Sequence, residues 1–309
     1  MGTPDFGKMA LCKMVEQGYN IVGVFTQVDK PRDRLKVECC AIKQEAIKLC
    51  LPVFSFAKLR DQDGIEAIRE LKPDLIITAA FGQILSQDIL NIPTLGVFNI
   101  HASLLPKYRG GCPIQWAIIN GEKETGITIM RTVLALDAGD IILQKSLPID
   151  EKDTYATLYH KLSCLGSECM MEVLKKQRLN FISQIESEST YYPVIKKIDG
   201  EINFSKTATQ ICNLIRGLNP NPTAYTYYDG VVLKIYFAEI VSNFDEDYFE
   251  QSNVKIGQVI VSNKKDGLII KCGEGSIEII ELQLPSKKRM NAKEFLLGNI
   301  IPIGTILGK

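Results

Sequence analysis

Histidine and tryptophan are scarce in this chain of 309 residues, which contains two histidines and one tryptophan. Its nine cysteines form no Cys-x-x-Cys pair. Without such pairs or a histidine cluster, the sequence lacks the usual ligand sets of a zinc site, and we expect no metal. The odd number of cysteines also argues against a disulfide framework and is typical of reduced thiols in the cytoplasm.

Net charge is absent as well, because 36 basic side chains balance 36 acidic ones. The whole molecule therefore has no field that would attract a polyanion, and a nucleic acid would have to be met by a local basic patch. The polar stretch 27–43 is one candidate, since its three acidic residues are outnumbered by Lys30, Arg32, Arg34, Lys36 and Lys43. Taken alone, such a stretch is more often a solvated loop.

Long apolar runs are also missing. No segment reaches 18 consecutive apolar residues, and the first residues carry no signal-peptide pattern, so we expect a soluble, cytoplasmic protein without a membrane partner. We further expect a monomer. The length allows two domains, and a hydrophobic content of 46% excludes a disordered chain.

In the first half of the chain, short apolar segments alternate with helical ones. The apolar segments expected to form strands are 21–26, 52–56, 74–80 and 96–100. This alternation predicts an α/β fold, a Rossmann-like, mostly parallel sheet covered by helices on both faces. Two further strands are expected over 125–133 and 141–149. In such sheets, ligands bind outside the carboxyl ends of the strands.

The last third of the chain has a different pattern. Short alternating segments separated by Gly, Asp and Asn turns predict a small C-terminal β-barrel (OB-like) with strands over 231–240, 257–263, 267–272 and 276–283. The mixed polar segment 181–200 predicts a linker between a first domain, 1–180, and a second domain, 201–309. Residues 198–309 contain 12 basic and 13 acidic residues, so basic charge occurs there only in local clusters.

The residues best suited to chemistry follow the apolar segment that starts at Gly96. Asn99 and His101 point the same way there, because strand side chains alternate. A neutral and a titratable donor side by side suit the polarisation of a carbonyl group. Asp137, in the glycine-containing connection 134–140, is a second candidate. A single His at a loop exit and a single Asp in a turn are more often structural, and the pattern alone leaves both interpretations open.

These residues lie within motifs of a known family. The sequence resembles the methionyl-tRNA formyltransferases over essentially its whole length, through Gly2-Thr-Pro-Asp-Phe6, Phe25-Thr-Gln27, Asn99-Ile-His-Ala-Ser-Leu-Leu-Pro-Lys-Tyr-Arg-Gly110, Pro113-Ile-Gln115, Glu124-Thr-Gly-Ile-Thr128, Leu136-Asp-Ala-Gly-Asp140, Asn219-Pro220 and Lys287-Lys-Arg-Met290. The Asn-x-His block marks the wider superfamily that uses 10-formyltetrahydrofolate. The first motif, the basic loop and the C-terminal barrel indicate the tRNA enzymes.

The resemblance implies an activity and roles for three residues. The formyl group of 10-formyltetrahydrofolate would be transferred to the α-amino group of methionyl-initiator-tRNA, for translation initiation. Asn99 and His101 would donate hydrogen bonds to the charge that develops on the formyl oxygen. Asp137, at the interval after His101 that the family shows, would support the charged imidazole and help relay the proton of the amine.

The resemblance also implies two sets of binding residues. Folate would contact the strand ends and the loop after His101, through Phe81, Gly82, Gln83, Ile84, Leu85, Ser103, Leu104, Leu105, Pro106, Tyr108, Arg109 and Gly110. The tRNA would be held by two basic groups, Lys30, Arg32, Arg34 and Lys36 in the basic loop and Lys287, Lys288 and Arg289 in the second domain.

Three features differ from the family pattern. Family members begin with an Ile-Val-Phe-type strand ahead of the Met that is Met1 here, so the resemblance implies that the first strand of the sheet is missing. The segment before Asp137, Thr132–Leu136, departs from the family's Met-Asp-x-Gly-Leu, and the basic loop lacks the family's glycines. The alternatives are a catalytically impaired homologue that binds tRNA or folate, a formyltransferase acting on another amine, and a formyltetrahydrofolate hydrolase.

Overall fold

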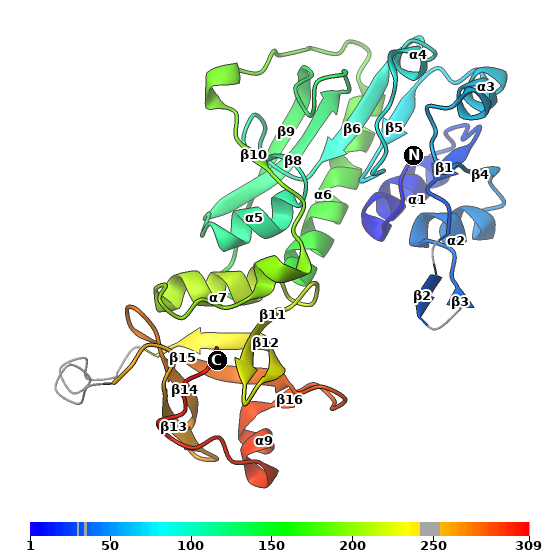
Figure 1. Ribbon diagram of the computed structural model, residues 1–309. Coiled ribbons are helices and arrows are strands. Elements are labelled where there is room, and N and C mark those ends of the chain that lie inside the picture. Colours follow the sequence, from blue (N-terminus) through cyan, green and yellow to red (C-terminus); the bar gives the residue numbers. More distant parts are fainter. Residues whose placement is uncertain (30, 34–35, 242–253, 309) are drawn as a thin grey trace. The chain divides into compact units, whose positions relative to one another are not determined.

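The computed structural model describes residues 1–29, 31–33, 36–241 and 254–308. They divide into two compact units, whose elements are labelled in Figure 1. The first unit comprises residues 1–113, 124–148 and 159–192, and the second comprises 114–123, 149–158 and 193–309.

The first unit is built on a four-stranded sheet with the order β5-β6-β8-β9. Its strands are β5 (Ile76–Thr78), β6 (Val97–His101), β8 (Glu124–Arg131) and β9 (Ile141–Pro148). Strand β6 runs parallel to β5, while β8 runs antiparallel to both β6 and β9. A separate parallel pair is formed by β1 (Val24–Thr26) and β4 (Val53–Ser55). The predicted α/β class is confirmed, with the detail that the sheet is mixed.

Met1 and Gly2 lie between the edges of the two parallel parts. The amide of Gly2 donates to the carbonyl of Phe25 in β1, and the amide of Ala79 donates to the carbonyl of Met1. Within the described residues, β1 and β5 are shorter than the predicted strands 21–26 and 74–80. An apolar pocket lies beside this bridge, lined by residues such as Val24, Ile76 and Leu11.

Helices cover these strands. They are α1 (Lys8–Glu16), α2 (Ala41–Lys48), α3 (Gln62–Leu71), the short α4 (Gln87–Leu90) and α6 (Tyr155–Lys175), with 3-10 turns at Asp5–Gly7 and Glu186–Glu188. Helix α6 packs so closely on the sheet that a Cβ at Gly166 would lie 2.8 Å from a methyl carbon of Ile100 on β6. The buried side chain of Ile100 therefore fixes how near this helix can approach.

The chain after α6 returns along the first unit. Ile182 exchanges two backbone hydrogen bonds with Ile141, and β10 (Tyr191–Tyr192) pairs in parallel with β7 (Arg109–Gly110). Residues 181–192, the first part of the predicted linker, thus lie against strands of this unit. A small antiparallel hairpin, β2 (Pro31–Asp33) and β3 (Lys36–Val37), stands in the basic loop.

The second unit contains a six-stranded antiparallel sheet with the order β11-β12-β15-β14-β13, to which β16 is added beside β15. Its strands are β11 (Ala224–Tyr228), β12 (Val231–Ile240), β13 (Val259–Asn263), β14 (Gly267–Lys271), β15 (Ser276–Gln283) and β16 (Met290–Asn291), and its helices are α5 (Pro113–Ile119), the 3-10 turn Lys197–Gly200, α7 (Ala208–Gly217) and α9 (Ala292–Gly298). Apolar side chains of the strands, α7 and α9 share one core. Closure of this sheet into a barrel stays a prediction.

The contact between Gly166 and Ile100 gives a stability prediction. Leucine at position 166 should lower the free energy of unfolding by about 1–3 kcal/mol, the usual cost of overpacking a filled core. The helical Gly298 is the matched control, because a Cβ there meets nothing within 4 Å, and Gly298→Leu should be neutral or stabilising. Urea unfolding of both variants checks this, and equal midpoints would contradict the packing argument.

Candidate active site

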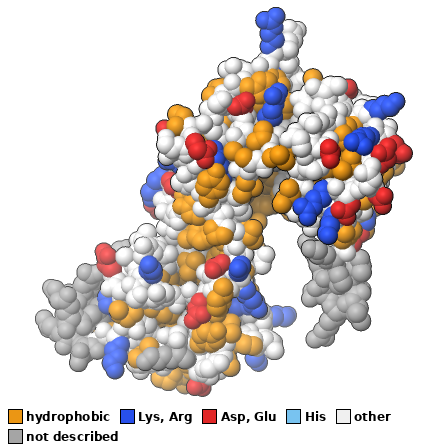
Figure 2. Space-filling view, turned by 45° about the horizontal axis from the view of Figure 1, so that its top comes forward, with side chains coloured by type: hydrophobic (Ala, Val, Ile, Leu, Met, Phe, Trp, Pro, Cys, Tyr) orange, Lys and Arg blue, Asp and Glu red, His pale blue; other side chains and the backbone are white. Residues whose placement is uncertain are grey.

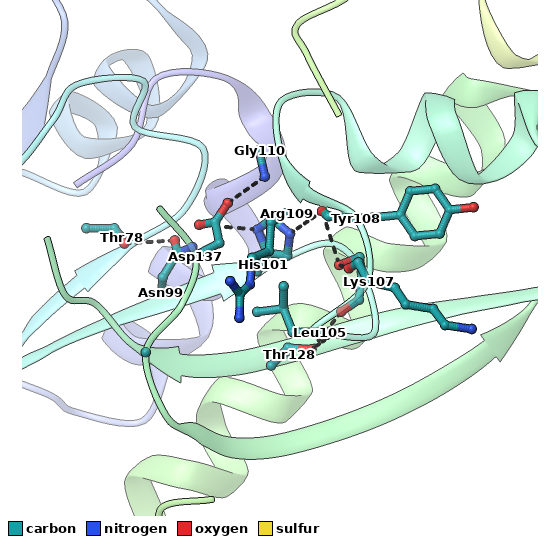
Figure 3. A network of polar contacts seen from close by, with 12 residues as sticks. Thr78, Asn99, His101, Leu105, Lys107, Tyr108, Arg109, Gly110, Thr128 and Asp137 are labelled. Carbon is teal, nitrogen blue, oxygen red and sulfur yellow. Dashed lines mark hydrogen bonds and ion pairs between the residues drawn. The ribbon is translucent and has the colours of Figure 1, made fainter. Parts of the chain in front are cut away.

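Asn99 lies in β6 in register with Thr78 of the parallel strand β5. The hydroxyl of Thr78 donates to the side-chain oxygen of Asn99 at 2.8 Å (Figure 3). Since this bond occupies the oxygen end of the amide, its two N–H donors are directed away from Thr78. Asn99 is therefore held as a hydrogen-bond donor.

His101 is at the end of the same strand and is 7% exposed. Its Nε2 lies 3.0 Å from the carbonyl oxygen of Tyr108, and because a carbonyl can only accept, Nε2 carries a hydrogen. The other ring nitrogen, Nδ1, lies 3.8 Å from Oδ1 of Asp137. This distance is too long for a direct hydrogen bond but leaves Nδ1 as the ring atom that faces the carboxylate.

Asp137 is carried by the connection between β8 and β9. Its Oδ2 accepts a hydrogen bond of 2.8 Å from the backbone amide of Gly110 (Figure 3). Its φ of 48° is in the left-handed region, which Asp tolerates better than most residues. Gly110 has a φ of 98°, and a Cβ on it would lie 2.5 Å from the carbonyl oxygen of Tyr192, so glycine is required there. The structure thus brings Asn99, His101 and Asp137 together at one strand end.

The loop after His101 is fixed by buried hydrogen bonds. The hydroxyl of Ser103, which is fully buried, donates to the carbonyl of Lys107 at 2.7 Å. Thr128 on β8 donates to the carbonyl of Ser103 and accepts from the amide of Leu105, and Gln144 on β9 donates to the carbonyl of Leu105. The loop that carries Leu104, Pro106 and Tyr108 therefore has a defined path beside the site.

The other predicted folate segment follows β5. Phe81 and Leu85 are buried and belong to the core beneath the loop, whereas Ile84 is 73% exposed. The side chain of Gln83 holds the chain at Phe56 and Leu59, and Gly82 is exposed. In the connection that carries Asp137, Leu134 and Leu136 are also exposed, at 63% and 60%. These exposed apolar side chains suit a flat, largely apolar ligand.

Arg109 takes part in a separate network. It is fully buried, and its guanidinium donates to the side chains of Gln184, Glu186 and Tyr191. The hydrogen bond from Arg109 keeps the pKa of Glu186 below its ordinary value of 4.5. The rings of Tyr108 and Tyr192 stack 4.8 Å apart beside it. Side chains of the protein thus bind the guanidinium of Arg109, and its contact with the cofactor stays a prediction.

The residues predicted to bind tRNA form two groups. Lys30 and Arg34 lie outside the described residues, while Arg32 and Lys36 belong to the β2–β3 hairpin. Lys287 and Lys288 are exposed, and Arg289 forms an ion pair with Glu281 and lies over the ring of Tyr236. On the face shown in Figure 2, basic and acidic side chains are interspersed. The contacts of these residues with tRNA stay a prediction.

Several residues around the site were missed by the sequence analysis. Thr78 orients Asn99, Thr128 and Gln144 hold the 103–108 loop, and Gln184 donates to the carbonyls of Asp137 and Gly139. Their signals in the sequence are weak, because each is a common polar residue far along the chain from its partner. Within the ranges that the structure describes, no group of three His, Cys, Asp or Glu residues could hold a metal, and no helix is long and apolar enough to cross a membrane.

Solved structures with a similar fold include formyltransferases. A sugar 3N-formyltransferase solved with dTDP and 5-N-formyl-tetrahydrofolate has a TM-score of 0.67 at 22% identity, covering 93% of this chain and 97% of that one. A methionyl-tRNA formyltransferase from Clostridium thermocellum has a TM-score of 0.54 at 21% identity, covering 72% and 96%. Such low identities show a common fold and nothing more about the chemistry.

Sequence comparison is more specific. Residues 1–174 match the family described as formyl transferase, and residues 194–299 match the formyl transferase C-terminal domain. The methionyl-tRNA formyltransferase of Caldanaerobacter subterraneus subsp. tengcongensis is 44% identical, covering 99% of this chain and 98% of that protein. The one from Clostridioides difficile is 41% identical, covering 100% and 98%. This chain therefore belongs to the methionyl-tRNA formyltransferase family.

The ion pair of Arg109 gives a prediction about acid stability. Because the folded-state pKa of Glu186 is lowered, the pair stabilises the protein above the ordinary pKa, and this stabilisation is lost as the pH falls through the lowered value. The melting temperature of Glu186→Gln should therefore fall less than that of the unchanged protein between about pH 6 and pH 3, an interval that spans the ordinary pKa of a glutamate.

Glu188→Gln is the matched control, because this carboxylate is on the same segment but is not among the partners of Arg109. Melting curves at several pH values measure the effect. Equal acid sensitivity of the Glu186→Gln and Glu188→Gln variants would contradict the role given to the ion pair.

Proposed function

We propose that this protein transfers the formyl group of 10-formyltetrahydrofolate to the α-amino group of methionyl-initiator-tRNA. The observation that carries the proposal is the arrangement of Asn99, His101 and Asp137, three polar side chains held at one strand end by hydrogen bonds that are buried or partly buried. The extent and level of identity to methionyl-tRNA formyltransferases support the choice of acceptor.

The geometry suits attack of an amine on a formyl carbon. Negative charge then develops on the formyl oxygen and is stabilised by donors already in place. The amide of Asn99 offers N–H groups because its oxygen is occupied by Thr78. His101 offers a second donor at Nδ1 when the ring is protonated, since Nε2 already donates to Tyr108. The carboxylate of Asp137 stabilises this cationic ring across 3.8 Å.

The proton balance of the transfer fits the same residues. The attacking amine loses one proton as the new C–N bond forms, and the departing folate nitrogen gains one as its bond to the formyl carbon breaks. Asp137, 15% exposed at its side chain, can take the proton of the amine through a water and pass it on. The folate supplies only the formyl group.

The surroundings also suit a folate. Exposed Ile84, Leu134 and Leu136 offer apolar surface for a pterin ring, while the loops Phe81–Leu85 and Ser103–Gly110 offer backbone groups on either side of the strand end. We propose these two loops as the folate contacts. We assign no metal to the reaction.

For the tRNA we propose two basic contacts, the loop around Lys30–Lys36 and the cluster Lys287–Arg289. We also propose the domain organisation predicted from the sequence: a catalytic domain over residues 1–180, a linker over 181–200, and an OB-like tRNA-binding domain over 201–309. The match of residues 194–299 to a family C-terminal domain supports a separate second domain. We further propose a cytoplasmic monomer.

The test of the function is formyl transfer from labelled 10-formyltetrahydrofolate to charged tRNA. Methionyl-initiator-tRNA should be formylated, and methionyl-elongator-tRNA should not. Equal formylation of both would overturn the specificity. Binding of tRNA without formylation would replace the proposal with that of a catalytically impaired homologue.

Replacing His101 should identify the oxyanion donor. His101→Asn should lower kcat by at least about 100-fold, the usual effect of losing such a donor, while tRNA binding persists. His160→Asn is the control, because the only other histidine is exposed on α6, and its kcat should be unchanged. A fully active His101→Asn variant would rule out the donor role.

The basic cluster of the second unit gives a salt-dependent prediction. Lys287→Ala combined with Lys288→Ala should raise KM for tRNA and reduce the slope of log affinity against log salt by about 1 to 2, since each phosphate contact releases counterions. The paired Lys264 and Lys265, also exposed, serve as the matched control. The same slope in both double variants would exclude the 287–289 cluster as a phosphate contact.

A further inference from the structure

We propose that Gln184, oriented by Arg109, is a positioning residue that holds the backbone of Asp137 and so aligns its carboxylate with His101. The inference rests on the proposed function, because it concerns the same site. It is carried by the hydrogen bonds of one half-buried side chain, which comes from the segment that returns along the first unit after α6.

The amide of Gln184 uses both of its ends. Its Nε2 donates to the carbonyl oxygens of Asp137, at 2.8 Å, and Gly139, at 2.7 Å. Its Oε1 accepts from Nε and Nη2 of Arg109, at 3.1 and 2.9 Å. A guanidinium only donates and a carbonyl only accepts, so the amide cannot be reversed without losing all four bonds. Arg109 thereby fixes which face of Gln184 meets the Asp137 connection.

The connection between β8 and β9 has few other contacts that would fix the conformation of Asp137. Asp137 has a left-handed φ of 48°, a conformation that Asp tolerates better than most residues but that still costs free energy in a residue other than glycine. The four side chains that precede Asp137, Val133 to Leu136, are exposed. They therefore do not pack into a core that would fix the turn. Gly139 sits so close to the base of the turn that a Cβ would lie 1.8 Å from the carbonyl oxygen of Arg131.

The bonds form a closed ring through the site. Gly110 donates from its backbone to the carboxylate of Asp137, Asp137 accepts at its own carbonyl from Gln184, and Gln184 accepts from the side chain of Arg109, the residue next to Gly110. Asp137 is therefore held by hydrogen bonds at two points, its carboxylate and its backbone carbonyl. The backbone bond sets the position of the residue, and the carboxylate bond sets the direction of its side chain.

The tripeptide Tyr108-Arg109-Gly110 also contacts His101. Tyr108 accepts from Nε2 of the ring through its carbonyl, and Gly110 binds Asp137 through its amide. Arg109 between them is fully buried, and its third guanidinium nitrogen, Nη1, donates to Glu186 and Tyr191. Moving Arg109 would therefore shift both partners of the 3.8 Å approach between His101 and Asp137. This assigns Arg109 to the support of the site.

The test replaces Gln184 by methionine, which keeps the length of the side chain and removes its four hydrogen bonds. In Gln184→Met, kcat for formyl transfer should fall about 10- to 100-fold, the effect expected when a catalytic group is displaced by up to about 1 Å. KM for tRNA should be unchanged. Ser183→Ala is the matched control. Ser183 bonds the neighbouring Asp140 at 2.9 Å, and its loss should leave kcat unchanged.

A double-mutant cycle separates positioning from general loss of structure. If Gln184 acts through Asp137, Gln184→Met should cause no further loss of kcat in an Asp137→Asn background. An equal loss in both backgrounds, or an unchanged kcat in Gln184→Met alone, would overturn the proposal.

Hydrogen exchange of the free protein keeps the test independent of the proposed function. Gln184→Met should accelerate amide exchange in residues 132–140, and Ser183→Ala should not. If exchange in Gln184→Met is accelerated but the unchanged protein transfers no formyl group, the positioning role of Gln184 stands and the proposed function is rejected. If exchange in residues 132–140 is unchanged in Gln184→Met, the positioning role of Gln184 is rejected.

Discussion

The approach of His101 to Asp137 depends on the main chain of one short segment. A carbonyl of this segment fixes the ring through Nε2, and an amide two residues later fixes the carboxylate through Oδ2. Main-chain groups hold more firmly than long side chains, because less conformational freedom has to be lost when they bond. The four-stranded sheet carries the histidine, and the loop bonds of Thr128 and Gln144 carry the segment. The remaining architecture of the first unit keeps these two supports in register.

The parts of the fold that were predictable are those that local sequence dictates. Alternation of apolar residues with Gly, Asp and Asn turns located β12 and β15 to the residue, because each strand has one buried face that sets its extent. The shared direction of Asn99 and His101 followed from the same period of two. Family motifs then supplied Asp137, which no local pattern distinguishes from a turn residue.

The parts that were not predictable depend on long-range contacts. Residues 21–23 join no ladder within the described residues, because strand pairing depends on what lies beside a segment in space and not on its apolar residues alone. Gln184 is 47 residues from the carbonyl that it binds, and one glutamine among many carries no mark of such a role. Arg109 was assigned from its motif to the cofactor, yet its burial and its partners could be known only once residues 184–191 were placed.

The bond between His101 and Tyr108 has a consequence for proton transfer. With Nε2 committed to a carbonyl, the neutral ring exists as a single tautomer, and all exchange of protons takes place at Nδ1. One atom thus changes from lone-pair acceptor to N–H donor while the ring stays still. Gain or loss of the proton at Nδ1 would therefore change the sense of a single hydrogen bond without any rotation of the His101 side chain.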